Sequence, residues 1–146
     1  MTQRNVETQR ALWGDWLHLW NGHYALAPGL VAPTFRLHTE LLDGSPDTTI
    51  NSPEKLVGWL TQSASAFEGF TFTTLVGPII DGPYVVGRWV VTGKCRGGIP
   101  GATAAPGTVV IFAGTDILRV QGGNIVEYWL SSDITSLLAQ LKVSAP

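Results

Sequence analysis

The chain contains Gly114-Thr115-Asp116-Ile117-Leu118-Arg119-Val120, followed by Gln121-Gly122-Gly123-Asn124 and Ile125-Val126-Glu127-Tyr128-Trp129, which predicts two β-strands joined by a tight turn. Gly and Asn tolerate the positive φ angles that short hairpin loops require. The first strand carries one carboxylate, Asp116, among apolar neighbours. Such a group needs a hydrogen-bond partner, or it faces a cavity where its charge or proton is used.

Helical spacing and turn residues predict the other elements. The expected order is a helix over 2–21, a short turn or helix over 24–31, a strand over 34–42, a helix from Ser52-Pro53-Glu54 to Glu68-Gly69, strands at about 70–80, 83–95, 104–120 and 123–131, and a last helix from Ser132 or Asp133 to about Leu141. Helices followed by long antiparallel strands are typical of an α+β fold. A strongly curved sheet around the helices would leave a conical, mostly apolar pocket suited to a small molecule.

Composition limits the possible partners. With 146 residues, we expect one domain over 1–146 that is large enough for a real core. The chain is 45% hydrophobic and only 14% charged, which indicates that a partner subunit covers part of the surface. The net charge of −2 and the lack of a basic run argue against nucleic acid.

Cysteine content and hydropathy favour a cytoplasmic protein. The one cysteine, Cys95, excludes an internal disulfide and a Cys-rich metal site, and no His/Asp/Glu cluster has the spacing of metal ligands. The first ten residues are polar, and no apolar run approaches the length of a membrane span.

An ordered set of segments carries a family resemblance. It comprises Leu19-Trp20-Asn21-Gly22 at the end of a Trp-rich helix, Ala32-Pro33-Thr34-Phe35, Gly58-Trp59, the glycine-rich bend 93–101, the hairpin quoted above, and Asp133 with Leu138-Ala139-Gln140-Leu141. The set covers nearly the whole chain and resembles the SnoaL-like family of the nuclear transport factor 2 superfamily. The resemblance implies a cone-shaped α+β fold, a homodimer formed through the sheet, and relatives that include polyketide cyclases, hydroxylases and isomerases.

The chain departs from the resembled enzymes at their carboxylates. The acid/base aspartate of aldol-type polyketide cyclases falls on Leu130, and a histidine of those cyclases falls on Asp116. The Arg-x-Asp and the last-strand aspartate of related epoxide hydrolases fall on Arg88, Val90 and Leu130. Neither catalytic mechanism is complete in this chain. If the chain is an enzyme, the resemblance implies that its catalytic carboxylate is Asp116 instead.

Three residues are therefore predicted to be catalytic: Asp116 as the acid/base, His38 as its assistant, and Arg88 as a group that keeps Asp116 ionised or binds a ligand oxygen. Each has a structural alternative. In these alternatives, Asp116 forms a buried ion pair with Arg88 or Arg119, and His38 is an ordinary surface residue.

Aromatic residues are predicted to line the pocket, because flat rings suit a flat or fused-ring ligand. The predicted substrate-binding residues are Trp20, Phe35, Trp59, Phe112, Tyr128 and Leu130, and the structural alternative is that the aromatic ones form the core. Gly114 shares a strand face with Asp116, so it either leaves room for a ligand or marks a bulge.

These observations predict a cofactor-free acid/base enzyme, a cyclase, isomerase or related lyase or hydrolase. Its substrate would be a small hydrophobic metabolite of polyketide or terpenoid type. The alternatives are a non-catalytic dimer that binds a hydrophobic ligand, and an epoxide hydrolase-like enzyme with a rearranged site.

Overall fold

The computed structural model of the chain describes residues 3–39 and 47–143. In chain order, the elements are α1 (Gln3–Trp20), the 3-10 helix η1 (Tyr24–Leu26), α2 (Ala27–Leu30), β1 (Val31–His38), α3 (Pro53–Ser65), β2 (Phe67–Asp81), β3 (Tyr84–Cys95), β4 (Val109–Gln121), β5 (Asn124–Ser132) and α4 (Ile134–Gln140).

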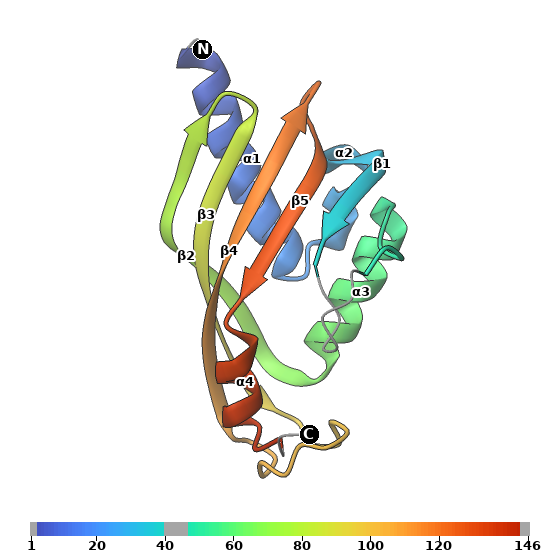
Figure 1. Ribbon diagram of the computed structural model, residues 1–146, viewed down its shortest axis with the longest axis vertical. Helices are drawn as coiled ribbons and strands as arrows, with labels where there is room; N and C mark the ends of the chain where they lie inside the picture. The colour runs from blue at the N-terminus through green and yellow to red at the C-terminus, as the bar shows by residue number, and fades with distance from the viewer. Residues whose placement is uncertain (1–2, 40–46, 144–146) are drawn as a thin grey trace.

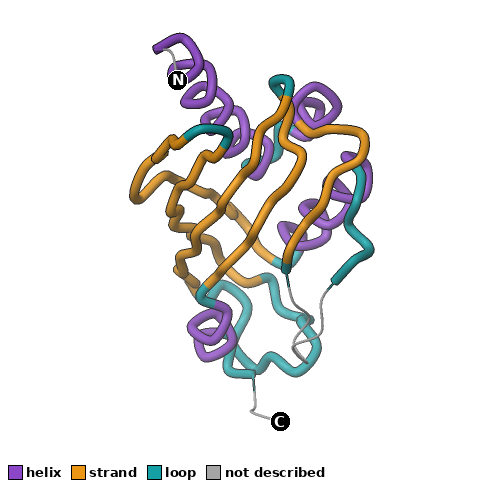
Figure 2. The backbone as a smooth tube through the Cα atoms, turned by 45° about the horizontal axis from the view of Figure 1, so that its top comes forward, coloured by secondary structure: helices purple, strands orange, loops and turns teal. Residues whose placement is uncertain are grey.

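The strands form one curved, unclosed sheet in the order β1-β5-β4-β3-β2. β1 runs parallel to β5, and the other neighbours are antiparallel. Helices α1, α2 and α3 gather on one face of this sheet, while α4 packs near one end of β4 (Figures 1 and 2). The predicted α+β fold with helices held inside a curved sheet is confirmed.

The Gly-Gly hairpin decides the register of the centre of the sheet. Gly122 and Gly123 have φ angles of 61° and 82°, which a two-residue hairpin loop of this type requires. Gln121 and Asn124 pair directly across the loop, and Asp116 lies opposite Leu130 further down the ladder. The predicted hairpin is confirmed.

Three boundaries of helices and strands differ from the prediction: the end of α3, the start of β4 and the start of β1. Ser52 caps α3 as expected, because its hydroxyl accepts a hydrogen bond of 3.2 Å from the Lys55 amide. The helix nevertheless ends at Ser65, since Phe67 already pairs with Cys95 in the sheet. β4 begins at Val109 and not near 104, because the preceding segment turns at Gly107.

The third shift concerns the first strand, which begins earlier than predicted, at Val31. Positions 40–42 of the predicted strand lie outside the described residues.

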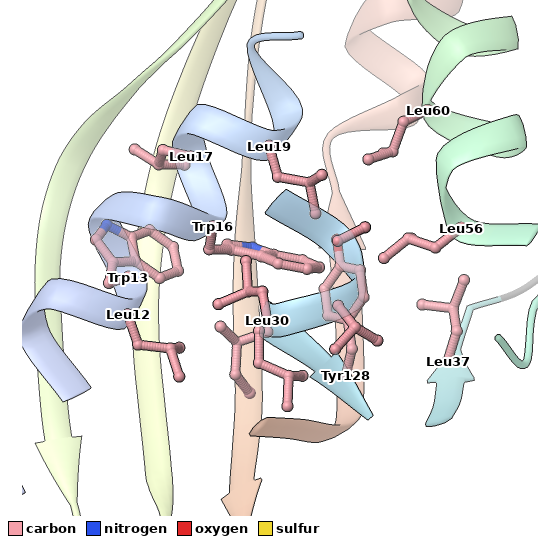
Figure 3. Close-up of a cluster of buried hydrophobic side chains, with 14 of the residues drawn as sticks. Leu12, Trp13, Trp16, Leu17, Leu19, Leu30, Leu37, Leu56, Leu60 and Tyr128 are labelled. Atoms are coloured by element: carbon pink, nitrogen blue, oxygen red, sulfur yellow. The ribbon is translucent and has the colours of Figure 1, made fainter. Parts of the chain in front are cut away.

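Two apolar clusters fill the space between helices and sheet. The main cluster packs α1 against the sheet. In Figure 3, the side chain of Trp16 on α1 contacts Tyr128 of β5, and their ring centroids are 4.9 Å apart. The second cluster lies at the other end of the sheet and contains Phe67, Cys95, Ala104, Val110 and Leu141.

Candidate functional site

Asp116 lies inside the fold and is held by neutral donors. Its side chain is 1% exposed. The indole of Trp16 donates to Oδ2 at 3.0 Å, and the hydroxyl of Tyr128 donates to Oδ1 at 2.9 Å. Trp89 also lies close enough to lower the pKa of the carboxyl group. Burial raises the pKa of Asp116 to about 6, although Trp16, Trp89 and Tyr128 act in the opposite direction. Asp116 therefore titrates close to neutral pH.

Among the described side chains no arginine pairs with this carboxylate, so the alternative of an ion pair between Asp116 and Arg88 or Arg119 is wrong. Gly87 is the residue opposite Asp116, and Arg88 lies opposite Thr115 on the other face of the sheet. Arg88 donates to the Thr115 hydroxyl at 3.2 Å and pairs with Asp133 at 3.1 Å. It neither holds Asp116 ionised nor reaches the inner face.

His38 belongs to a separate cluster on the same outer face as Arg88. Its Nε2 lies 2.5 Å from the Glu127 carboxylate, whose other oxygen accepts from Arg119 at 2.9 Å. The ring stacks on Trp129, with centroids 4.8 Å apart and planes 5° from parallel. Partial burial acts to raise the pKa of Glu127, but His38 and Arg119 hold it below its usual value.

The three residues predicted to be catalytic are therefore not brought together. Glu127, which binds His38, alternates with Tyr128, which binds Asp116, so the two side chains leave opposite faces of β5. A mechanism in which His38 assists Asp116 and Arg88 positions it has no basis in this geometry.

An apolar cavity of about 340 Å³ lies at the end of the sheet covered by α3 and α4. It is lined by Trp20, Trp59, Ser63, Ala66, Phe67, Phe70, Phe72, Trp89, Ile99, Phe112, Leu130, Ser132, Ile134, Leu137, Leu138 and Leu141. No carboxylate, imidazole, amine, guanidinium, thiol or phenol occurs among these described lining residues. Such a cavity offers shape and apolar contact, and the polar groups of these lining side chains are two serine hydroxyls and the indole N–H groups of three tryptophans.

Four residues predicted to bind substrate line this cavity: Trp20, Trp59, Phe112 and Leu130. Tyr128 is fully buried beside Asp116 and does not line it. Phe35 lines a wider groove of about 1640 Å³ along β1, together with His38. The groove and the cavity share four lining residues, Trp59, Leu130, Ser132 and Ile134, so the two spaces adjoin.

Sequence reasoning missed Trp89 and misread Gly114. The two residues face each other across β3 and β4, and the Trp89 indole occupies the space beside Gly114. Gly114 therefore neither leaves room for a ligand nor marks a bulge between β3 and β4. A glycine directly opposite a large aromatic residue is the signal that could have found this contact, but it requires the strand register. The three α4 residues of the lining, Ile134, Leu137 and Leu138, were also missed.

Two further observations concern the described residues only. They contain no group of three or more His, Cys, Asp or Glu side chains placed to hold a metal ion. None of the helices in the described ranges is both long and apolar enough to cross a membrane.

Residues 14–141 match the family of SnoaL-like polyketide cyclases. The chain belongs to this family. No curated protein matches the chain.

Solved structures of the family's fold superpose over almost the whole chain. A candidate polyketide cyclase of Bacillus cereus is 20% identical, with a TM-score of 0.80 over 99% of this chain and 87% of that one. TsrD of Streptomyces laurentii is 19% identical, with a TM-score of 0.76 over 99% of both chains. IdmH of Streptomyces antibioticus, a candidate polyketide cyclase, is 23% identical, with a TM-score of 0.75 over 91% of this chain and 97% of that one. At these identities the likeness establishes a shared fold.

Proposed function

We propose that the protein binds a flat, hydrophobic metabolite of polyketide or terpenoid type in the apolar cavity and promotes its cyclisation or isomerisation by holding a reactive conformation. The lining of the cavity carries this proposal: it combines several aromatic rings with aliphatic side chains and has no acid or base among its described residues. Holding reacting atoms together lowers a barrier without proton transfer by the protein. Membership of a family of polyketide cyclases supports the substrate class.

The experiment measures ligand binding directly. Trp20, Trp59 and Trp89 line the cavity, so an aromatic ligand such as anthraquinone should quench the tryptophan fluorescence saturably. Leu137→Glu places a charge in the wall and should abolish this quenching. Leu26→Glu changes a half-exposed residue that is not part of the lining and should leave it intact. Absence of saturable quenching by apolar aromatic probes would remove the proposal.

Acid/base catalysis by Asp116 is a second candidate function, and one observation favours it. Its pKa of about 6 suits proton transfer near neutral pH. The carboxylate is one side chain away from the cavity, because Trp89 lies close enough to lower its pKa and also lines the cavity. This function requires Trp89 to move aside. If Asp116→Asn keeps ligand binding and turnover of a bound substrate, Asp116 is not the acid/base.

We also propose that two copies associate through the outer face of the sheet. This face carries no helix from α1, α2 or α3 (Figure 1). It presents exposed apolar side chains from three neighbouring strands: Val76, Ile79, Tyr84, Val109, Ile111 and Ile117. An apolar area of this kind is typical of a surface covered by a partner. The same face carries charges of both signs, which suits a self-complementary contact. The charged residues are Arg88, Arg119, Glu127 and Asp133.

A further inference from the structure

The imidazole of His38 is held in one orientation by its neighbours. Its Nε2 lies 2.5 Å from Oε2 of Glu127, and Trp129 stacks against the ring with the two planes 5° from parallel. Arg119 donates to the other oxygen of Glu127 at 2.9 Å, so this carboxylate is itself fixed in place. An ionised carboxylate only accepts hydrogen bonds, so Glu127 keeps the proton of the neutral imidazole on Nε2. The lone pair on Nδ1 is then the basic site of the ring.

His38 also borders the groove close to its junction with the apolar cavity. β1 is an edge strand, and the groove is lined by residues of both its faces, among them Leu37 and His38. The register of β1 against β5 pairs His38 with Trp129, and the next residue of β5, Leu130, lines both spaces. A ligand that fills the cavity and extends past Leu130 therefore enters the groove near His38.

Among the described residues that line the two spaces, His38 is the best placed base. Asp47 is the one carboxylate in these linings, and it accepts hydrogen bonds from the amide and the hydroxyl of Thr49 at 2.9 and 2.7 Å. These bonds lower the pKa of Asp47, which makes it a weaker base. The side chain of His38 is 35% exposed despite its contacts, so a ligand in the groove has access to it.

We propose that His38, positioned by Glu127, is a general base for a ketone-bearing ligand that extends from the cavity into the groove. The inference rests on the proposed binding function and adds a proton-transfer group to it. Nδ1 takes a proton from a carbon next to the ketone, and the electron pair of that C–H bond moves onto the ketone oxygen to give an enolate. The imidazolium is stabilised by Glu127. It returns the proton to another carbon in an isomerisation, or to the alkoxide formed when the enolate carbon attacks a second carbonyl in a cyclisation.

The elimination of 5-nitrobenzisoxazole tests the base with a small aromatic probe. A base removes the proton on the isoxazole carbon, the C–H electrons complete a nitrile, and the N–O bond breaks to release a coloured phenolate. His38→Gln should lower kcat/KM for this reaction by about 100-fold or more. His23→Gln is the matched control, because His23 is exposed and lies outside both described linings. Anthraquinone quenching should persist in His38→Gln.

Nuclear magnetic resonance of the ring nitrogens tests the positioning role of Glu127. We expect the neutral His38 ring to carry its proton on Nε2 in the wild type. In Glu127→Gln the amide both donates and accepts, so this preference should be lost and the elimination should slow. A proton on Nδ1 in the wild type would overturn the proposal, because the assigned base would have no lone pair. This measurement also decides the matter if His38→Gln does not fold.

The remaining failures are distinct. If the wild type does not bind anthraquinone, the proposed function fails, and the ligand assigned to His38 falls with it. If the wild type binds anthraquinone but does not accelerate the elimination, or folded His38→Gln is as fast as the wild type, only the assignment of His38 is overturned. A loss of rate in Asp116→Asn and not in His38→Gln would assign the base to Asp116 and would also overturn it.

Discussion

The hydroxyl of Tyr128 donates a hydrogen bond of 2.9 Å to Oδ1 of Asp116, and the two residues lie on adjacent strands with almost no exposed surface. Burial, followed by the neighbouring Asp116 charge, raises the pKa of Tyr128 well above its ordinary value. Burial also raises the pKa of Asp116, but only to about 6. Near neutral pH the phenol therefore keeps its proton and directs it at the carboxylate, away from any ligand.

Tyr128→Phe should destabilise the protein at pH 7, because the variant removes one of the donors that hold a buried charge. The expected loss in the free energy of unfolding is about 1–3 kcal/mol. The loss should be smaller at pH 4.5, where Asp116 carries a proton. Urea denaturation at both pH values measures this, and Tyr84→Phe, at a residue that is 41% exposed, is the control. An equal loss at both pH values would contradict the assignment of this hydrogen bond to the ionised carboxylate.

Asp116→Asn should change how stability depends on pH. The pKa of Asp116 is about 6 in the folded protein and 3.8 as its ordinary value, so between these pH values the folded state binds a proton that the unfolded state has lost. The free energy of unfolding of the wild type therefore falls as pH rises through this window, by about 3 kcal/mol from this group, and is level above it.

The asparagine cannot titrate, so the variant gains stability relative to the wild type as pH rises from 4 to about 6. Urea midpoints at several pH values check this. Asp133→Asn is a suitable control because Asp133 lies on the exposed outer face. If the stability curves of Asp116→Asn and the wild type run parallel between pH 4 and 7, the pKa of Asp116 is not raised.

Local signals in the sequence were enough to predict most of the fold. The spacing of Trp13, Trp16 and Trp20 marks one face of α1, and Gly122-Gly123 specifies the hairpin loop. These signals depend on residues within one or two turns of one another. The end of α3 could not be predicted in this way, because Phe67 fits helical spacing and is drawn into the sheet by its pairing with Cys95.

The surroundings of Asp116 could not be predicted, because they depend on register. Alternation along a strand correctly placed Asp116 on the face of Phe112 and Gly114. Alternation does not say which residue of β3 lies opposite Asp116. If the register of β3 against β4 shifted by one residue, Arg88 would replace Gly87 opposite Asp116, and the neutral site would become an ion pair. Trp16, which binds Asp116, is 100 residues away in the chain.

Arg88→Gln should have little effect on either stability or binding. The pair with Asp133 is 37% and 51% exposed, and exposed ion pairs contribute about 0–1 kcal/mol. The Arg88 side chain also lies on the opposite face of the sheet from the cavity wall formed by Trp89. Thermal unfolding and anthraquinone titration test both statements. A ten-fold loss of binding with unchanged melting temperature would show that Arg88 has a role in the ligand site after all.

Replacing two apolar residues of the outer face should separate the proposed dimer. Ile79 of β2 and Ile111 of β4 are 57% and 54% exposed, and both side chains leave the face opposite the core. In a dimer formed through this face, the Ile79→Lys/Ile111→Lys variant would bury charges without partners, which costs several kcal/mol. We expect light scattering at micromolar concentration to report dimers for the wild type and monomers for this variant. Leu26→Lys, on η1 and away from the sheet, should remain dimeric. A wild type that is monomeric at these concentrations, or a double variant that stays dimeric, would show that the outer face is not the interface.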